Sequence, residues 1–430
     1  MTRVLVVTSG DLHGAPLGSG IRALELARTL RDHGEVTLAV AGDAPTAVDG
    51  MPCVGFHPHD PLALAQPLRD ADVVLCTPRW PRVMRAIRRS GARLVFDLYD
   101  PEPLALIPGF PGQRPAVRRW VAEYSIDRVA EALRIGDHFL CSSERQRDLW
   151  LGMMLAERLI DSGRSDDDPS LRSLIDVVPF GIPEERPAAQ GQGPRERFPA
   201  LDREHEVVLW NGGLWPWLDS ETPIRAVARL AERRPVRLVF MGAAGGLPAD
   251  RATERARGLA SRLGVLDRSV FFNDAWVPYA ERAAWLGQAD CAVSAHTDSM
   301  ETRFAFRTRL LDCLWSGLPI VCTEGDELAE LVEREGLGAA VPPSDPHALA
   351  TALEQVLDRG RGGCEAAFQR VRPRFAWSEV SRPLVRMLAG PAPPPAPGRS
   401  VGRAEGLRRA LYLSGRRALD TVGVRDWPRL

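Results

Sequence analysis

Short apolar runs rich in β-branched residues alternate with amphipathic helical stretches along this chain, and the whole alternation occurs twice. The first series places predicted strands at 4–9, 36–40, 72–76, 93–98, 138–142 and 175–179. The second places them at 206–211, 236–242, 270–272, 291–295, 319–323 and 339–341. Short strands separated by helices form parallel sheets covered by helices on both faces. The sequence therefore predicts an α/β fold with two Rossmann-like, doubly wound domains facing each other across a cleft.

Segments without periodicity set the predicted domain limits. Residues 183–204 are rich in proline, glycine and charge, and we expect a linker there. The N-terminal domain is then 1–182 and the C-terminal domain 205–375, followed by a helical segment at 376–390 and by a Pro-rich spacer and basic tail at 391–430. Helices are expected at 21–33, 117–135, 143–162, 220–234, 306–316 and 345–358, among others.

Composition removes several kinds of chemistry. All 55 basic residues are arginine, so the chain has no lysine for a phosphate-binding P-loop or a Schiff base. A net charge of −1 gives no field that would attract nucleic acid. The seven cysteines contain no C-x-x-C pair and are expected to be buried apolar residues, without a metal. The chain lacks a signal-peptide pattern and an apolar run of membrane-spanning length, so a cytoplasmic protein is expected.

A glycine-rich segment precedes the first predicted helix. Residues 18–23, GSGIRA, match the G-x-G-x-x-A dinucleotide fingerprint. In that fingerprint the glycines follow the strand directly, whereas here eight residues lie between them and the first strand. A loop in which Gly18 and Gly20 let the backbone approach a ligand in the cleft is the preferred interpretation, with a structural turn as another. In the preferred interpretation, Arg22 points into the cleft.

Two further strand ends carry polar or aromatic residues. Asp97 and Asp100 follow a strand of the first domain, where they would orient hydroxyl groups, act as a base, or cap a turn. Gly212 and Gly213 follow the first strand of the second domain and permit a sharp turn. Trp215 and Trp217 come next, and we expect either a stacking platform for a ligand or part of the core between the domains.

The densest group of charges lies just before a buried strand, in METRFAFRTRLLDCLWSGLPIVCT. A helix that begins near Phe306 would direct its positive end toward the cleft, with Arg303, Arg307 and Arg309 beside it, which suits a diphosphate. Asp312, about two turns into that helix, would accept hydrogen bonds from a vicinal diol such as ribose. Glu301 lies in the preceding loop, within reach of a hexose. The alternative is a solvated helix with surface ion pairs.

At this point the sequence resembles the retaining glycosyltransferases of the GT-B fold, family 4. The resemblance covers nearly the whole chain to about residue 390 and rests on GSGIRALELARTL, VVPFGIP, NGGLW and LLDCLWSGLPIVCT. In that family two acids eight positions apart hold the donor, the first at the sugar and the second at the ribose. Asp312 matches the second acid. Eight positions earlier stands Phe304, and the nearest acid is Glu301.

Other motifs of the family are altered in this chain. Phe304, Ala305 and Phe306 lie in TRFAFR, which replaces the glycine-rich loop of the donor site. The basic pair that usually grips diphosphate after the first strand of the second domain is replaced by WPWLD. Arg303 or Arg307 is therefore expected to supply the lost positive charge.

The resemblance implies a metal-independent enzyme without a cofactor that moves a sugar from a nucleotide-diphosphate sugar to an acceptor with retention of configuration. It also implies that the N-terminal domain binds a small-molecule or lipid-linked acceptor, and that helix 376–390 crosses back to that domain. The segment 403–418 is compatible with a helix at a membrane surface, a packing helix or a disordered arm. An arginine-only composition indicates a GC-rich, for example actinobacterial, genome, in which such enzymes make envelope glycans or antibiotics.

Three other functions are also compatible with the sequence. One is a nucleotide-sugar enzyme of the same fold with different chemistry, such as epimerisation or a coupling without a glycosidic bond. Another is a nicotinamide-dependent oxidoreductase that uses GSGIRA. The last is a non-catalytic protein that keeps the fold.

Overall fold

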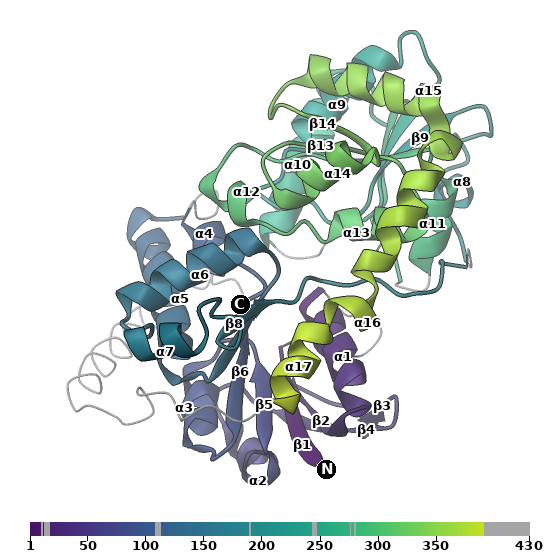
Figure 1. The fold of residues 1–430 in the computed structure, drawn as a ribbon. Helices are drawn as coiled ribbons and strands as arrows, with labels where there is room; N and C mark the ends of the chain where they lie inside the picture. Colours follow the sequence, from purple (N-terminus) through teal and green to yellow (C-terminus); the bar gives the residue numbers. More distant parts are fainter. Residues whose placement is uncertain are drawn as a thin grey trace.

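The computed structural model describes residues 1–9, 12, 18–107, 113–188, 191–242, 247–275, 277–278 and 281–390. Two α/β domains lie one above the other, and the last helices of the chain pass from the upper domain to the lower one (Figure 1). The predicted α/β architecture with two doubly wound domains is thereby confirmed. The predicted spacer and tail at 391–430 lie outside the described residues.

The N-terminal sheet has eight strands in the order β3-β4-β2-β1-β5-β6-β7-β8. They are β1 (Thr2–Thr8), β2 (Gly34–Ala41), β3 (Ala47–Val48), β4 (Met51–Phe56), β5 (Val73–Cys76), β6 (Arg93–Asp97), β7 (His138–Cys141) and β8 (Ile175–Val177). Only β3 and β4 pair antiparallel, and the sequence did not predict these two. In β1, Val6 pairs with Leu38 on one side and Leu75 on the other, so the chain order reverses at this strand.

Helices of the N-terminal domain cover both faces of this sheet. They are α1 (Gly18–Arg31), α2 (Ala65–Asp70), α3 (Pro81–Arg89), α4 (Glu102–Leu106), α5 (Pro115–Ile135), α6 (Glu144–Ala156) and α7 (Ser162–Asp167), with a 3-10 turn at Pro61–Leu64. The helix predicted at 143–162 ends earlier, as α6 at Ala156, and α7 begins only at Ser162. Alternate residues of β1 belong to different apolar clusters: Val6 packs with α1, whereas Leu5 packs with α2 and α3. This alternation is the consequence of the two-residue period of a strand.

The C-terminal sheet has the strand order β11-β10-β9-β12-β13-β14. Its strands are β9 (Glu206–Trp210), β10 (Val236–Phe240), β11 (Val270–Phe272), β12 (Cys291–Ser294), β13 (Ile320–Thr323) and β14 (Gly338–Val341). In order along the chain this is the 3-2-1-4-5-6 arrangement, which binds ligands where the order reverses, here between β9 and β12.

The helices of the C-terminal domain also form two layers. They are α9 (Glu221–Leu230), α10 (Leu247–Arg262), α11 (Arg282–Gln288), α12 (Met300–Phe304), α13 (Arg309–Ser316), α14 (Glu327–Glu335) and α15 (Pro346–Val371). Leu209 of β9 packs with α11, α13 and α14, and Trp210 packs with α9, α10 and α15. The helix predicted at 345–358 continues as α15 to Val371, through a break at Gly360, whose φ of 62° is favourable for glycine.

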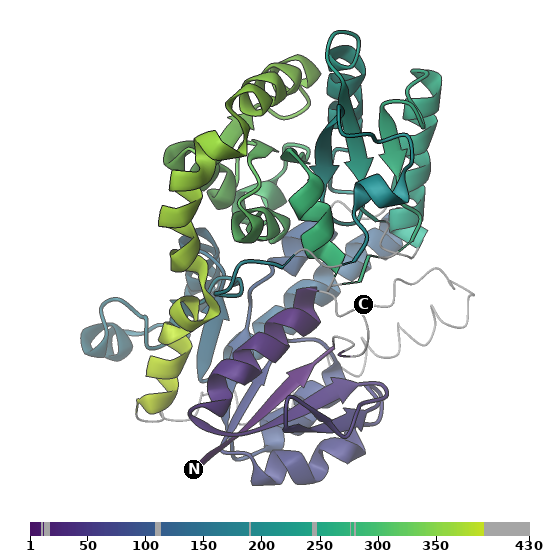
Figure 2. The ribbon, with the colours of Figure 1, turned by 90° about the vertical axis from the view of Figure 1, so that its right-hand side faces the viewer.

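The chain crosses between the domains at two places that touch each other. Ile182 donates to the carbonyl of Phe375 at 2.8 Å, and Trp377 donates to the carbonyl of Ile182 at 3.1 Å. Beyond this point, α16 (Trp377–Val380) and α17 (Arg382–Ala389) pack on the N-terminal domain, where Leu384 is fully buried (Figures 1 and 2). Arg93 donates to the carbonyls of Met387 and Gly390.

The segment predicted to be a linker is partly ordered against the C-terminal domain. It contains the short helix α8 (Pro194–Arg197), and the amide of Gly193 donates to the Glu196 carboxylate at 2.8 Å. The ring of Phe198 contacts the rings of Phe271 and Trp285. Aromatic packing of this kind supplies order that the composition of the segment did not predict.

The domains also meet on the side away from the crossings. The start of α6 faces α12 and the turn before α14. Gln146 donates to the carbonyl of Phe304 at 2.9 Å, and Arg145 donates to the carbonyl of Gly325 at 3.0 Å and pairs with Glu330. The two domains are therefore held together at both sides of the cleft.

Candidate active site

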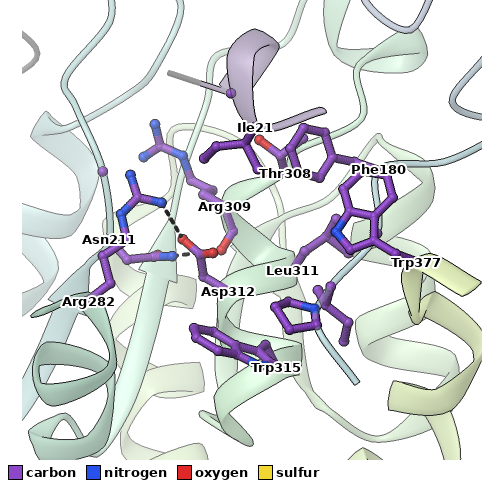
Figure 3. Close-up of a pocket in the computed structure, with 15 residues that line it drawn as sticks. Ile21, Phe180, Asn211, Arg282, Thr308, Arg309, Leu311, Asp312, Trp315 and Trp377 are labelled. Carbon is purple, nitrogen blue, oxygen red and sulfur yellow. Dashed lines mark hydrogen bonds and ion pairs between the residues drawn. The ribbon is translucent and has the colours of Figure 1, made fainter. Parts of the chain in front are cut away.

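A cavity of about 160 Å³ opens between the two domains, beside the crossings (Figure 3). Both domains and both crossing segments line it. The lining residues are Gly18, Ile21, Phe180, Gly181, Ile182, Pro183, Asn211, Gly212, Arg282, Thr308, Arg309, Leu311, Asp312, Trp315 and Trp377. One wall is polar and the other is largely aromatic and aliphatic.

The turn after β9 forms part of the polar wall. Gly212 has a φ of 134°, which an L-residue with a side chain rarely adopts, so the sharp turn predicted at this glycine is present. Asn211 before it is 2% exposed, and its Nδ2 donates to the carbonyl of Arg309 at 2.7 Å. This hydrogen bond fixes the end of β9 against the start of α13.

Helix α13 directs its N-terminus at the cavity. It begins at Arg309, three residues later than predicted, after Thr308, whose side chain makes no cap. Asp312 therefore lies in the first helical turn and not two turns in. Amides of the first turn of a helix have no partner within the helix and carry partial positive charge, so this end of the cavity favours an anion.

Asp312 faces an arginine from another helix. Nη1 of Arg282, the first residue of α11, lies 3.4 Å from Oδ2 of Asp312 (Figure 3). Burial raises the pKa of Asp312, while Arg282, Arg309 and a hydrogen bond from Asn211 act in the opposite direction. The carboxylate is thus a half-buried acceptor with one defined cationic neighbour.

Arg309 is a half-buried cation in the same wall. Its Nη2 donates to the carbonyl of Gly213 at 3.0 Å, and its guanidinium lies 5.0 Å from the ring centre of Trp210. Its Nη1 has no hydrogen-bond partner within the described part of the chain. Burial, followed by the charge of Arg307, lowers its pKa to about 10, so Arg309 stays charged at neutral pH.

The remaining charges of the 300–312 segment lie outside this cavity. Glu301 and Arg307 are buried and paired with each other, at 2.7 and 3.1 Å. Nε of Arg307 is also 3.8 Å from Asp326, which caps α14 and lies 3.4 Å from Nε2 of His296. Glu301 belongs to α12 and not to a loop. The predicted contact of Glu301 with a sugar is therefore replaced here by an internal ion pair.

The other members of that segment have varied surroundings. Arg303 is exposed, and its guanidinium lies over the ring of Phe304, 5.8 Å from its centre. Ala305 is buried and Phe306 packs against the apolar core. The structure does not bring these four residues to the cavity that holds Asp312.

Arg22, predicted to point into the cleft, is 1% exposed. It donates to both carboxylate oxygens of Asp97, at 2.6 and 2.8 Å, and to the carbonyls of Val178 and Pro179. Both predicted cleft residues, Arg22 and Asp97, thus satisfy each other and tie α1 to the first crossing. The reason is that the Arg22 side chain follows the buried face of α1, on which Leu26 and Leu30 also lie.

The glycines before Arg22 belong to α1, which starts at Gly18 and not at residue 21. Gly18 lines the cavity, and Gly20 is buried inside the helix. Most of the loop before Gly18, residues 10, 11 and 13–17, lies outside the described residues.

Asp100 has an accessible side chain that is nevertheless closely surrounded by both domains. Burial, followed by the negative charges of Glu102 and Glu301, raises its pKa to about 7, and Arg79 and Arg307 oppose this shift. The side chain is exposed, and the charges that act on it come from both domains.

Trp215 and Trp217 stack on each other, with ring centres 5.2 Å apart and planes at 4°. Both are half-buried against the apolar cluster of the C-terminal domain and do not line the cavity. The pair therefore packs on the core of the C-terminal domain itself, and not in a core between the domains as the second alternative had it. Gly213, next to them, contributes the carbonyl that accepts from Arg309.

Several cavity residues escaped the sequence prediction. Asn211 directly follows a predicted strand, so the rule that ligands bind at strand ends offered a signal for it. Trp315 follows Leu314 in the apolar part of its helix but is half-exposed in the cavity. Arg282 and Trp377 gave no local signal, because their role depends on packing between distant segments. Among the described residues, no three His, Cys, Asp or Glu side chains gather where they could hold a metal ion.

Comparison with known proteins gives a match over the C-terminal part of the chain. Residues 205–359 match the family model described as glycosyl transferases group 1. This part of the chain is therefore similar to a glycosyl transferases group 1 domain. It contains β9, α13 and every cavity residue from Asn211 to Trp315.

Two relatives share part of the sequence. A D-inositol 3-phosphate glycosyltransferase of Corynebacterium efficiens is 29% identical over 208 residues, which are 47% of this chain and 47% of the relative. One of the same name from Corynebacterium glutamicum is 31% identical over 185 residues, or 42% of each chain. The alignments thus span less than half of each relative's length.

Solved structures resemble nearly the whole molecule. Anabaena HepE, crystallised with UDP and glucose, has a TM-score of 0.68 at 16% identity, covering 91% of this chain and 100% of that one. WaaG, a glycosyltransferase of lipopolysaccharide biosynthesis, has a TM-score of 0.58 at 17% identity, covering 89% and 98%. The fold is therefore the GT-B fold of glycosyltransferases, as the sequence indicated. Within the described residues, no helix combines the length and apolar character needed to cross a bilayer.

Proposed function

We propose that this protein transfers a sugar from a nucleotide-diphosphate sugar to an acceptor, with retention of configuration and without a metal ion. The observation that carries the proposal is the cavity between the domains, where Asp312, Arg309 and the N-terminus of α13 face the Gly212 turn. A carboxylate next to an anion-binding helix end and a half-buried arginine suits a ribose joined to a diphosphate.

In this proposal the diphosphate lies on the first-turn amides of α13 and on Nη1 of Arg309. Both carry positive charge toward the cavity, and neither needs to reorganise when charge develops on the departing diphosphate. The carboxylate of Asp312 accepts hydrogen bonds from the ribose hydroxyls. Trp315, Phe180 and Trp377 supply the apolar wall on which a ring packs.

The acceptor, a small molecule or a lipid-linked sugar, would enter from the N-terminal domain. Asp100 lies on that side of the cleft and shares surroundings with Glu301 and Arg307 of the other domain. The bond from the anomeric carbon to the diphosphate breaks, and a bond to the acceptor oxygen forms on the same face. The acceptor's hydroxyl proton goes to a phosphate oxygen of the leaving diphosphate. Closure of the domains would exclude water from this step.

The comparisons support a nucleotide-sugar donor. The related Corynebacterium proteins are named glycosyltransferases, and the crystals of HepE contain UDP and glucose. Arg303 is exposed and Arg307 is paired with Glu301, whereas Arg309 lines the cavity, so Arg309 provides the cation for the diphosphate in this proposal.

A ligand panel tests the proposal. Thermal unfolding is measured with UDP, GDP, dTDP, ADP, NAD and the corresponding nucleotide sugars. A ligand at 100 times its dissociation constant stabilises a protein by about 2.7 kcal/mol, which gives a clear shift. We expect one nucleoside diphosphate family to shift the transition in the native protein and not in Asp312→Asn, and its sugar conjugate to be consumed when acceptors are added. A shift with NAD alone, or with none of these ligands, would overturn the proposal.

A further inference from the structure

We propose that Arg282 is a positioning residue whose guanidinium orients the carboxylate of Asp312 toward the ribose of the donor. This inference rests on the proposed function and extends it to a residue outside the 300–312 segment. Arg282 does not need to touch the donor for this role, because it acts through Asp312.

The geometry of the pair is specific. Arg282 is the first residue of α11, and Asp312 lies in the first turn of α13, so the two helices present their N-terminal ends to the same cavity (Figure 3). Nη1 of Arg282 lies 3.4 Å from Oδ2 of Asp312, and the side chains are 18% and 24% exposed. An ion pair with this little exposure is screened less than one on the open surface.

The carboxylate of Asp312 keeps acceptor directions for a ligand in this arrangement. An ionised carboxylate offers two oxygens and about four acceptor directions. Arg282 approaches Oδ2 and Asn211 contributes one further hydrogen bond, so acceptor directions remain for hydroxyl groups that enter the cavity. A carboxylate held by two partners has a fixed rotamer, and a fixed rotamer lowers the entropy lost when a diol binds.

Arg282 also keeps the carboxylate in the form that accepts hydrogen bonds. Burial raises the pKa of Asp312, and the largest opposing influence is Arg282, ahead of Arg309 and the hydrogen bond from Asn211. These are the charged and polar groups that face Asp312 from α11, from its own helix and from the end of β9. Without Arg282, Asp312 would hold its proton to a higher pH and would accept fewer hydroxyl groups.

Arg309 cannot take over this role. Its Nη2 donates to the carbonyl of Gly213, and its guanidinium lies over the ring of Trp210. Arg309 and Asp312 belong to the same helix, α13, so the backbone of the helix fixes how far apart they lie. The three arginines around the α13 start therefore have separate tasks: Arg307 pairs with Glu301, Arg309 faces the cavity, and Arg282 faces Asp312.

The test measures donor affinity between pH 5.5 and 8 by calorimetric titration with UDP-glucose, GDP-mannose, ADP-glucose and dTDP-glucose. Nucleotide sugars are used because a free diphosphate has a terminal phosphate that titrates near pH ~6 and would mask the effect. The variants are Arg282→Met, Arg282→Lys, Asp312→Asn and the double variant Arg282→Met/Asp312→Asn. Arg225→Met, on the exposed face of α9, is the control.

We expect Arg282→Met to bind the donor about tenfold more weakly at pH 8, and to lose further affinity as the pH falls. Arg282→Lys should recover most of the affinity and of the native pH profile. Asp312→Asn should be weak and independent of pH, and the double variant should be no weaker than Asp312→Asn, since Arg282 acts through Asp312. Thermal unfolding of each variant shows that it is folded.

The outcomes separate the two proposals. If the native protein binds none of the four donors, the proposed function fails and this inference fails with it. If the native protein binds one of them and Arg282→Met binds it equally well at every pH, only the role of Arg282 is refuted. Affinity losses that add fully in the double variant would also refute it, because they would mean that Arg282 contacts the donor independently.

Discussion

Arg307 donates to both carboxylate oxygens of Glu301, at 3.1 and 2.7 Å, and neither side chain is as much as a tenth exposed. Glu301 and Arg307, which the sequence analysis predicted to bind the donor, thus form an ion pair with each other. The pair connects α12 to the residues just before α13, and it sits beside Asp326 at the start of α14. Its main role in this structure is to hold the segment before α13 in place.

Arg307→Ala should destabilise the protein. It leaves Glu301 buried without its cation and removes a neighbour of Asp326, and such a loss costs about 3 kcal/mol or more. Urea unfolding should show a clearly lower midpoint than that of Arg303→Ala, whose side chain is exposed. The double variant Glu301→Leu/Arg307→Met should recover a large part of the loss. Equal midpoints for Arg307→Ala and Arg303→Ala would contradict a structural role for the pair.

Arg309→Met should weaken donor binding by at least about tenfold, since hydrogen bonds to charged groups contribute about 1.5–3 kcal/mol. The remaining affinity should depend less on salt, because a cation has been removed from the site. Arg303→Met serves as the matched control, because it removes the same group from an exposed position six residues earlier. Titration with the nucleotide sugar at low and high salt measures both effects. Equal losses of donor affinity in the two variants would show that positive charge near α13 attracts the donor in general, without a specific contact from Arg309.

His138 should make the protein sensitive to mild acid. It is 4% exposed in β7, and burial, with the charge of Arg93, lowers its pKa to about 4. An unfolded histidine binds a proton below about pH 6.5, so the unfolded state gains protons first. The free energy of unfolding should therefore fall, by up to about 3 kcal/mol, as the pH drops from 6.5 to 4.

His138→Asn tests this assignment. Nδ1 of His138 lies 2.6 Å from the carbonyl of Ser173, and the asparagine amide replaces that donor without titrating. Urea midpoints between pH 4 and 7 should fall less steeply with acid in the variant than in the native protein. Parallel curves would assign the acid sensitivity to other groups.

Gly181→Ala should disturb the crossing point. A Cβ at this position would lie 2.5 Å from Cδ2 of Trp377, whose ring is already packed against Phe180. Overpacking of this kind costs about 1–3 kcal/mol, and donor affinity should fall too, because both residues line the cavity. Gly152→Ala in α6 is the control, since a Cβ there meets nothing within 4 Å. Similar melting temperatures for the two variants would show that the tryptophan moves aside freely.

The sequence was sufficient for the features that depend on local pattern. The alternation of strands and helices predicted both sheets, and the turn at Gly212 followed from its place at a strand end. Asp312 lines the cavity, but from the first turn of its helix and not from two turns in. The sequence pattern missed β4, whose run MPCVGF contains a proline and a glycine that weaken a strand signal. Pairing with β2 on one side and the short β3 on the other supplies the missing stability.

The errors at the site have one physical origin. Arg22 and Asp97 are 75 positions apart, and Arg282 and Asp312 are 30 apart, so no periodicity relates the members of either pair. A sequence pattern shows which face of a helix is buried, but it does not show which distant side chain contacts that face. For this reason Arg22 was placed in the cleft, and Arg282 was not noticed.

The packing of α17 on the N-terminal domain affects the order in which the two domains are completed during synthesis. Leu384 fills the apolar cluster that β1 and α1 form, and Arg93 of β6 is bound to the carbonyls at the end of α17. The N-terminal domain is therefore assembled from both ends of the described chain. During synthesis its first 180 or so residues leave the ribosome with one side still uncovered. The domain made first is the one completed last, after the whole C-terminal domain has emerged.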